Sequence, residues 1–281
     1  MSHLMQDIAV FFDDSDLGQS ILETGAHLAR DQNARLIGLA SNEKNDATPE
    51  DGFARGEGIV DVIRRLESSS ESHLLHASQS LANVAGRYGV TAEFRVIPYF
   101  GSDIDMQLNS FYSDLLLVGY PEALGTPFAW SSIKALQQTG VPILIVPRAW
   151  NGRAIARRIT VAWNASRQAR RAVADAFPLL LAAEAVDLLI VDPERRAERY
   201  GEDPGADMAA YLSRHGVQVN LRRASSQGRP VAETIVAHAL EMNSDLIVFG
   251  AYSHSRISEA VLGGVSRTLL AEVPLPLFVS Y

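Results

Sequence analysis

Residues 8–15 read IAVFFDDS and residues 159–166 read ITVAWNAS, and these two stretches decide the fold. Each is a short apolar run, rich in β-forming residues, that ends in a polar turn and leads into a helical pattern. Two further pairs of segments repeat in the same order: DLLLVG at 114–119 with DLIVFG at 245–250, and VPILIVP at 141–147 with LPLFVSY at 275–281. Three matched segments in one order indicate that a whole domain is duplicated.

Within each copy, apolar strand candidates alternate with stretches of helical periodicity. Strands that are buried on both faces of a parallel sheet are expected to be almost continuously apolar. The expected strands lie at 8–12, 34–40, 92–99, 114–119 and 142–146, and then at 159–163, 186–192, 217–225, 245–250 and 276–280. The expected helices lie at 15–32, 59–88, 103–112 and 128–139, and then at 167–183, 206–215, 230–242 and 258–272. The sequence therefore predicts two tandem doubly wound α/β domains, each a five-stranded parallel sheet with helices on both faces.

The predicted domains cover residues 1–150 and 151–281, joined by a short linker at 148–157 that contains Asn151 and Gly152. Their charges differ. The first has 10 basic and 19 acidic residues, a net charge of −9, and the second has 15 and 14, a net charge of +1. An anionic ligand would meet less repulsion in the second domain. The net charge of −8 for the chain argues against a general nucleic-acid binder.

Composition excludes several classes of site. The chain has no cysteine, so disulfides, thiolate metal sites and cysteine nucleophiles are ruled out. Its first residues lack a signal-peptide pattern, and no apolar run approaches the roughly 18–20 residues that span a bilayer. We expect a soluble, cytoplasmic protein that does not bind membranes. No spacing pairs a nucleophile with a base, so the sequence indicates no efficient enzyme.

The segment that carries the predicted chemistry follows the fourth strand of the second copy. Residues 250–270 read GAYSHSRISEAVLGGVSRTLL, in which Gly263 and Gly264 lead through Val265 and Ser266 into a helix. Glycines let backbone N–H groups approach phosphate oxygens, and a helix N-terminus adds a partial positive charge. The Ser266 hydroxyl is a further donor. This segment is predicted to cradle an anion.

The duplicated fold, the VAWNAS segment and the GAYSHSR…LGGVSR segment resemble the universal stress protein family. The resemblance covers nearly the whole chain, and it implies a Rossmann-like fold of the adenine nucleotide alpha hydrolase type. ATP-binding members of that family carry G-x2-G-x9-G-[S/T] after the fourth strand. Here the frame falls on Gly250, Ser253, Gly263 and Gly264, so a serine replaces one glycine and a glycine replaces the hydroxyl residue. The motif is weakened but keeps its backbone donors.

The resemblance also implies what the site would bind. The ligand would be ATP or AMP, with any Mg²⁺ held mainly by the phosphates. An acidic residue usually meets the adenosine at the end of the first strand, where this chain has Asp13 and Asn164. Occupancy would change a surface that a protein partner reads. The predicted site residues are Ala162, Asn164, Val191, Gly250, Ser253, His254, Gly263, Gly264, Val265 and Ser266.

The first copy departs further from the family motif. After Gly119 it places Glu122 and Ser132 where the second and third glycines would fall, and its cradle is three residues shorter. A carboxylate there would repel phosphate. The first site is therefore predicted to be lost for ATP.

Other interpretations stay open on the sequence alone. One alternative is that the chain is a scaffold that binds no nucleotide and acts through protein contacts. A third interpretation is a small-ligand pocket in the first domain, lined by Asp13, Asp14, Tyr120, Glu122, Phe128 and Trp130. Asp13 and Asn164 are also typical of residues that only organise a turn.

Further residues have plainer interpretations. The pair His73 and His76 is typical of a solvated helix face, Trp163 of the core, and the run around Arg195 of a charged surface. The resemblance implies that residues 143–146 pair with 277–279 inside the chain, and it leaves further dimerisation open.

Overall fold

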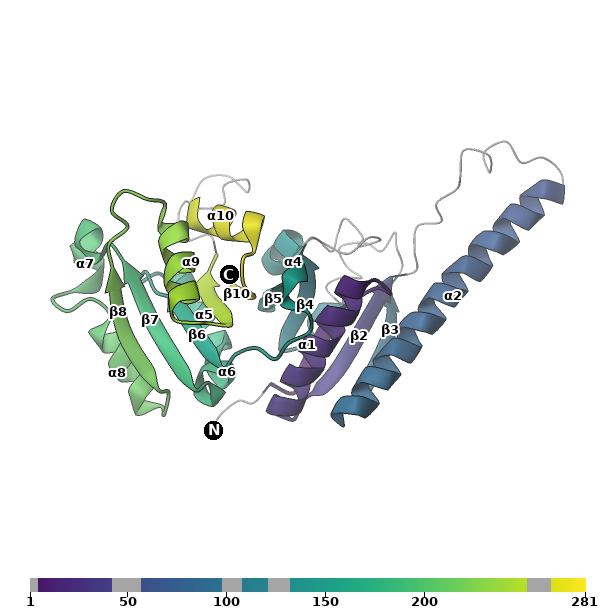
Figure 1. Ribbon diagram of the computed structural model, residues 1–281, viewed down its shortest axis with the longest axis horizontal. Helices are drawn as coiled ribbons and strands as arrows, with labels where there is room; N and C mark the ends of the chain where they lie inside the picture. Colours follow the sequence, from purple (N-terminus) through teal and green to yellow (C-terminus); the bar gives the residue numbers. More distant parts are fainter. Residues whose placement is uncertain (1–4, 42–56, 98–107, 121–131, 252–263) are drawn as a thin grey trace.

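The computed structural model describes residues 5–41, 57–97, 108–120, 132–251 and 264–281 (Figure 1). All ten predicted strands are present, displaced by at most two residues at either end. They are β1 Asp7–Phe11, β2 Arg35–Ser41, β3 Ala92–Ile97, β4 Leu115–Tyr120, β5 Ile143–Pro147, β6 Arg158–Ala162, β7 Ala185–Val191, β8 Val219–Ala224, β9 Leu246–Gly250 and β10 Leu277–Ser280. We refer to β1–β5 and their helices as the first half and to β6–β10 and theirs as the second half.

The helices follow the predicted pattern with one break. They are α1 Asp16–Gln32, α2 Glu57–Tyr88, α4 Ser132–Thr139, η3 Arg148–Trp150, α5 Arg167–Asp175, α6 Phe177–Ala182, η4 Pro193–Arg196, α7 Ala197–Tyr200, α8 Ala206–Arg214, α9 Val231–Glu241 and α10 Gly264–Glu272. The single helix predicted at 167–183 is wrong, because α5 ends and α6 begins at Ala176. Pro178 cannot donate a backbone hydrogen bond to the preceding turn, and a proline is tolerated only near a helix start. Parts of the helices predicted at 103–112, 128–139 and 258–272 lie outside the described residues.

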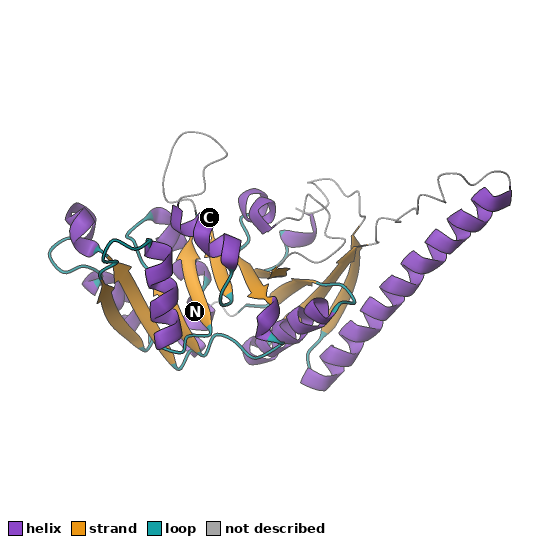
Figure 2. Ribbon diagram, turned by 45° about the horizontal axis from the view of Figure 1, so that its top comes forward, coloured by secondary structure: helices purple, strands orange, loops and turns teal. Residues whose placement is uncertain are grey.

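The strands form one ten-stranded sheet in the order β3-β2-β1-β4-β5-β10-β9-β6-β7-β8. Each half is parallel, and helices lie on both faces of the sheet (Figure 2). The halves join where β5 pairs antiparallel with β10, with Leu144 opposite Phe278. This confirms the predicted pairing of the last strands. Two doubly wound units therefore share one continuous sheet.

Burial follows from this arrangement. The central strands β4, β5, β9 and β10 are almost wholly buried, whereas the edge strands β3 and β8 are half-buried. The helix α2 extends beyond the edge of the first half's sheet (Figure 1). In the described part of the chain, no helix has the length and apolar character needed to cross a membrane.

The amino end of the first strand is held in the same way in both halves. In the first half, Oδ2 of Asp114 accepts hydrogen bonds from the backbone N–H groups of Gln6 (2.7 Å) and Asp7 (3.0 Å). In the second half, the Asp245 carboxylate accepts from the backbone N–H groups of Arg157 (2.9 Å) and Arg158 (3.0 Å). Burial raises the pKa of Asp245 above its usual value. The duplicated aspartate is therefore a structural clamp.

The turn after the first strand is also duplicated. Oδ1 of Asp13 accepts from the Ser15 N–H (3.1 Å), and Oδ1 of Asn164 accepts from the Ser166 N–H (3.2 Å). Both serines then cap the following helix through their hydroxyl oxygens. Both Asp13 and Asn164 thus organise their turns, as the plainer interpretation of the sequence expected.

The linker at 148–157 is fixed against the first half. Trp150 is buried, and its Nε1 donates to the carbonyl of Arg153 (2.9 Å). The backbone N–H of Gly152 donates to the Ser20 hydroxyl of α1 (2.6 Å). Asn151 and Gly152 have φ values of 54° and 67°, in the left-handed region that favours these two residue types. The linker is therefore a packed segment of the fold.

Candidate functional site

A pocket of about 360 Å³ opens at the carboxyl ends of β6, β7 and β9 and at the first turn of α10. It is lined by Ala162, Trp163, Asn164, Leu189, Val191, Asp192, Arg195, Tyr200, Val231, Ile235, Phe249, Gly250, Gly264, Val265 and Ser266. Seven of the ten predicted site residues therefore meet in one place. The other three, Ser253, His254 and Gly263, lie outside the described residues.

The sheet topology explains why the pocket lies here. β6 pairs with β7 on one side and with β9 on the other, so the chain order reverses between β6 and β9. The connections from two such neighbouring strands lead to opposite faces of the sheet and leave a crevice beyond the strand ends. The same reversal occurs between β1 and β4 in the first half.

One end of the pocket is polar and is formed by the start of α10. The backbone N–H groups in the first turn of a helix have no partner within the helix, and they carry a partial positive charge. Ser266 is only 5% exposed, and its hydroxyl makes no hydrogen bond to another residue that the structure describes. A Cβ at Gly264 would meet no atom of the described residues within 4 Å. This end has room and donors for an anionic group.

The rest of the wall is largely apolar. β7 and β9 contribute Leu189, Val191 and Phe249, while α9 contributes Val231 and Ile235, which are one helical turn apart. Such a wall suits a flat, apolar or aromatic part of a ligand. Trp163, predicted to lie in the core, packs against the core but is only half-buried, and just past the end of β6 it also lines the pocket.

The loop after β7 brings a charged pair to the pocket. The carboxylate of Asp192, itself only 5% exposed, accepts from the backbone N–H and the hydroxyl of Ser226, both at 2.6 Å. These hydrogen bonds lower the pKa of Asp192 below its usual value. Arg195 lies 3.3 Å from the same carboxylate, and 61% of its side chain is exposed. The arginine, predicted to be part of a charged surface, thus also places a cation beside the pocket.

Gly250 lines the pocket, but packing alone explains why this position is a glycine. A Cβ at this position would lie 2.2 Å from the backbone carbon of Gln168 and 2.4 Å from the backbone nitrogen of Ala169. Only glycine lets the first turn of α5 come this close to β9. At the equivalent Gly119, a Cβ would lie 2.4 Å from Cδ1 of Ile21. Helix packing therefore favours this glycine in both halves and demands it in the second, whether or not phosphate binds.

The candidate ligand residues of the first half are held in other contacts. Asp14 lies 3.3 Å from Nδ1 of His73, and the hydroxyl of Tyr120 donates to the carbonyl of Ala271 in α10. His73 was predicted to lie on a solvated face but is buried, while His76 is exposed. Glu122, Phe128 and Trp130 lie outside the described residues. Among the residues that the structure describes, no group of three His, Asp or Glu side chains is placed to hold a metal ion.

Comparison with known proteins identifies the domain in the second half and the fold of the chain. Residues 156–280 match the model of the universal stress protein family. Three solved structures resemble 98% of the chain: a universal stress protein from Archaeoglobus fulgidus DSM 4304 (18% identity, 97% of that chain, TM-score 0.66), a functionally unknown protein from Pseudomonas aeruginosa PAO1 (15%, 92%, 0.62) and a putative universal stress protein from Pseudomonas aeruginosa UCBPP-PA14 (16%, 93%, 0.61). No curated protein matches the sequence. The chain therefore has the fold of a tandem universal stress protein, with a universal stress protein domain in its second half.

Proposed function

We propose that the second half binds an adenine nucleotide, ATP or AMP, in the pocket between β6, β7, β9 and α10. The protein would then act as a regulatory module whose surface around α10 changes with occupancy. The observation that carries the proposal is Ser266 at the start of α10, a buried residue that lines the pocket beside an apolar slot and whose hydroxyl has no hydrogen-bond partner among the described residues. A phosphate at the helix start and a base in the slot would use both ends of the pocket.

Charge and size support this ligand class. The second half has a net charge near zero, whereas the first half is strongly acidic. Arg195 adds an exposed cation beside the pocket. The volume of about 360 Å³ falls within the usual range of about 300–1,000 Å³ for small-molecule sites. Any Mg²⁺ would be held mainly by the nucleotide's phosphates.

A scaffold that binds no nucleotide is the competing proposal, and one observation favours it. Gly250, the first glycine of the family motif, is required by the packing of α5 alone. Its retention is therefore expected even in a domain that has lost its ligand. The departures at Ser253 and Gly264 point the same way.

Calorimetric titration with ATP, AMP and adenosine separates the two proposals. We expect binding of ATP and AMP that is tighter than binding of adenosine, because only the nucleotides present a phosphate to α10. The variant Gly264→Asp should weaken AMP binding at least about tenfold, since its carboxylate would repel the phosphate. Gly264→Ser should tighten it by a few-fold through a new hydroxyl donor, because the position has room for a Cβ.

Gly86→Asp is the matched control. Gly86 is also a helical glycine, in α2 of the first half, and a Cβ there would meet no atom within 4 Å in the part of the chain that the structure describes. This variant should bind nucleotide like the wild type. No heat with millimolar ATP or AMP would end the nucleotide proposal. An unchanged affinity of Gly264→Asp for AMP would show that the phosphate does not bind at the start of α10.

A further inference from the structure

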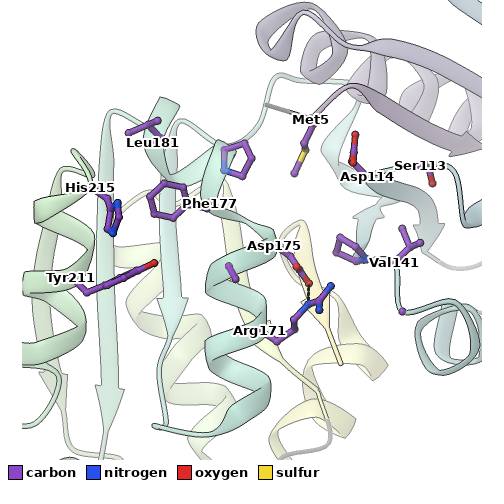
Figure 3. Close-up of a pocket in the computed structure, with 14 residues that line it drawn as sticks. Met5, Ser113, Asp114, Val141, Arg171, Asp175, Phe177, Leu181, Tyr211 and His215 are labelled. Carbon is purple, nitrogen blue, oxygen red and sulfur yellow. Dashed lines mark hydrogen bonds and ion pairs between the residues drawn. The ribbon is translucent and has the colours of Figure 1, made fainter. Parts of the chain in front are cut away.

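A second cavity of about 640 Å³ lies between the two halves and takes no part in the nucleotide proposal. Figure 3 shows its two walls. One wall is formed by the amino ends of first-half strands, with Met5, Ser113, Asp114 and Val141. The other is formed by α5, α6 and α8, with Arg171, Asp175, Phe177, Leu181, Tyr211 and His215. We call it the inter-half groove.

The path of the linker shows what such a groove can hold. β5 ends beside the start of β10, because Ile145 is paired with Leu277 in antiparallel register. The linker at 148–157 therefore starts at the amino edge of the second half and continues to the amino end of β6. On its way it lies against α1, where Gly152 donates to Ser20 and approaches Glu23. A short segment that begins with the 3-10 turn η3 thus lies between α1 and the amino edge of the opposite half.

The inter-half groove is the counterpart of that position. The pairing of Leu144 with Phe278, which are equivalent residues of the two copies, relates the halves by an approximate two-fold axis. When the helix caps Ser15 and Ser166 are superposed in sequence, Ser20 corresponds to Arg171, Glu23 to Ala174 and Ala156 to Met5. Arg171, Ala174 and Met5 all line the groove. The linker fills one of these two equivalent positions, and among the described residues no segment fills the other; residues 1–4, which precede Met5, lie outside the described residues.

We propose that the inter-half groove binds a short peptide segment of a partner protein, one that carries a bulky apolar side chain and a basic residue. The filled position is occupied by a segment of this kind, RAWNGRAI at 148–155, in which Trp150 is the buried apolar side chain. The groove is continuous with the interface between the halves. Its occupant is therefore expected to extend an interface that the fold already contains.

The groove wall explains the apolar side chain. α1 carries Ala26 and Arg30 where the second half carries Phe177 and Leu181, so the second position is the more apolar of the two. Leu181 is 37% exposed. The His215 ring lies 4.6 Å from the Tyr211 ring and 5.6 Å from the Phe177 ring, measured between centroids. A ring cluster with an exposed leucine is a typical anchor site for one large side chain.

Charge explains the basic residue. Oδ2 of Asp114 accepts both backbone hydrogen bonds, and its other oxygen makes none to the residues that the structure describes. The first half carries a net charge of −9. Asp175, by contrast, is paired with Arg171 at 2.8 Å, as the dashed line in Figure 3 marks. The free oxygen of Asp114 is the acceptor that an arginine or lysine of the peptide would meet.

The test uses the full chain and a fluorescein-labelled peptide of sequence RAWNGRAI, measured by fluorescence anisotropy. We expect saturable binding with a Kd on the order of 10–100 μM, as for a small and transient interface. The peptide with its tryptophan replaced by alanine should bind at least tenfold more weakly. The variant Leu181→Asp should also bind the original peptide at least tenfold more weakly, because a carboxylate cannot be buried against the rings.

Leu240→Asp is the matched control, since Leu240 is 55% exposed on α9 and does not line the groove. It should bind the peptide like the wild type, with thermal unfolding confirming that both variants fold. If Leu181→Asp fails to fold, Tyr211→Ala tests the same wall. No binding at 1 mM peptide, or equal binding by wild type and Leu181→Asp, would overturn the proposal. So would displacement of the peptide by equal concentrations of indole, which would show a small-molecule site. None of these outcomes depends on nucleotide binding.

Discussion

In the first half, Gly119, the residue before the last of β4, lies against a side chain of α1, whereas in the second half Gly250, the last residue of β9, lies against the backbone of α5. The aspartate clamp and the capped turn are the same in both. The difference shows that the strand-end glycine belongs to the shared framework, and that it is more stringently required in the second half. A residue that recurs in a duplicated chain first marks a requirement of the fold. Ligand binding needs separate evidence.

Substitution of the two strand-end glycines by alanine tests this comparison with the largest expected effect. Gly250→Ala places a Cβ against the backbone of α5, so we expect the free energy of unfolding to fall by about 3 kcal/mol or more. Gly119→Ala meets the end of the Ile21 side chain, which can rotate, and should lose only about 1–2 kcal/mol. Urea unfolding of the two variants measures the difference. Equal losses would show that the two positions are under the same constraint.

Removal of the aspartate clamp should have a smaller effect. Asp245→Ala leaves the N–H groups of Arg157 and Arg158 without their acceptor, and we expect a loss of about 1–2 kcal/mol. Asp114 is more exposed, so water can replace its carboxylate, and Asp114→Ala should lose less than about 1 kcal/mol. The same unfolding measurement checks both. A larger loss for Asp114→Ala would reverse the order expected from burial.

The smallest expected effect is on the pH dependence of stability, which compares two aspartates of the second half, Asp192 and Asp245. The folded-state pKa of Asp192 lies below its ordinary value of 3.8, so its contribution to stability is present above pH 3.8 and is lost as the pH falls through the folded pKa. The folded-state pKa of Asp245 lies above 3.8, so stability falls as the pH rises from 3.8 through that pKa.

Unfolding measured between pH 3 and pH 6 separates the two groups. Asp192→Asn should be closest to the wild type at low pH and fall behind it as the pH rises. Asp245→Asn should do the opposite, improving relative to the wild type as the pH rises. Parallel curves for wild type and both variants would contradict the assigned pKa directions.

Most of the fold could be predicted from the sequence because buried parallel strands are continuous apolar runs with polar ends. The break between α5 and α6 was missed, since Leu179 and Leu180 continue the apolar pattern through Pro178. The sequence predicted the pocket residues that lie in the glycine segment and at the end of β6. Val231, Ile235 and Tyr200 were missed because crossover connections bring them there from distant parts of the chain.

Two roles required three-dimensional information. The direction of Trp163 could not be read from the alternation along β6, since it lies just past the last residue of that strand. The packing role of Gly250 depends on the approach of α5, which no local pattern reports.

The strand pair at the centre of the sheet has a consequence for how such a chain can evolve. In a symmetric dimer of identical domains, the residue on the two-fold axis would have to face itself, and every mutation there would appear twice. Here Leu144 faces Phe278, a small and a large side chain that were free to change one at a time. Covalent fusion thus lets each copy specialise while the other preserves the contact between them.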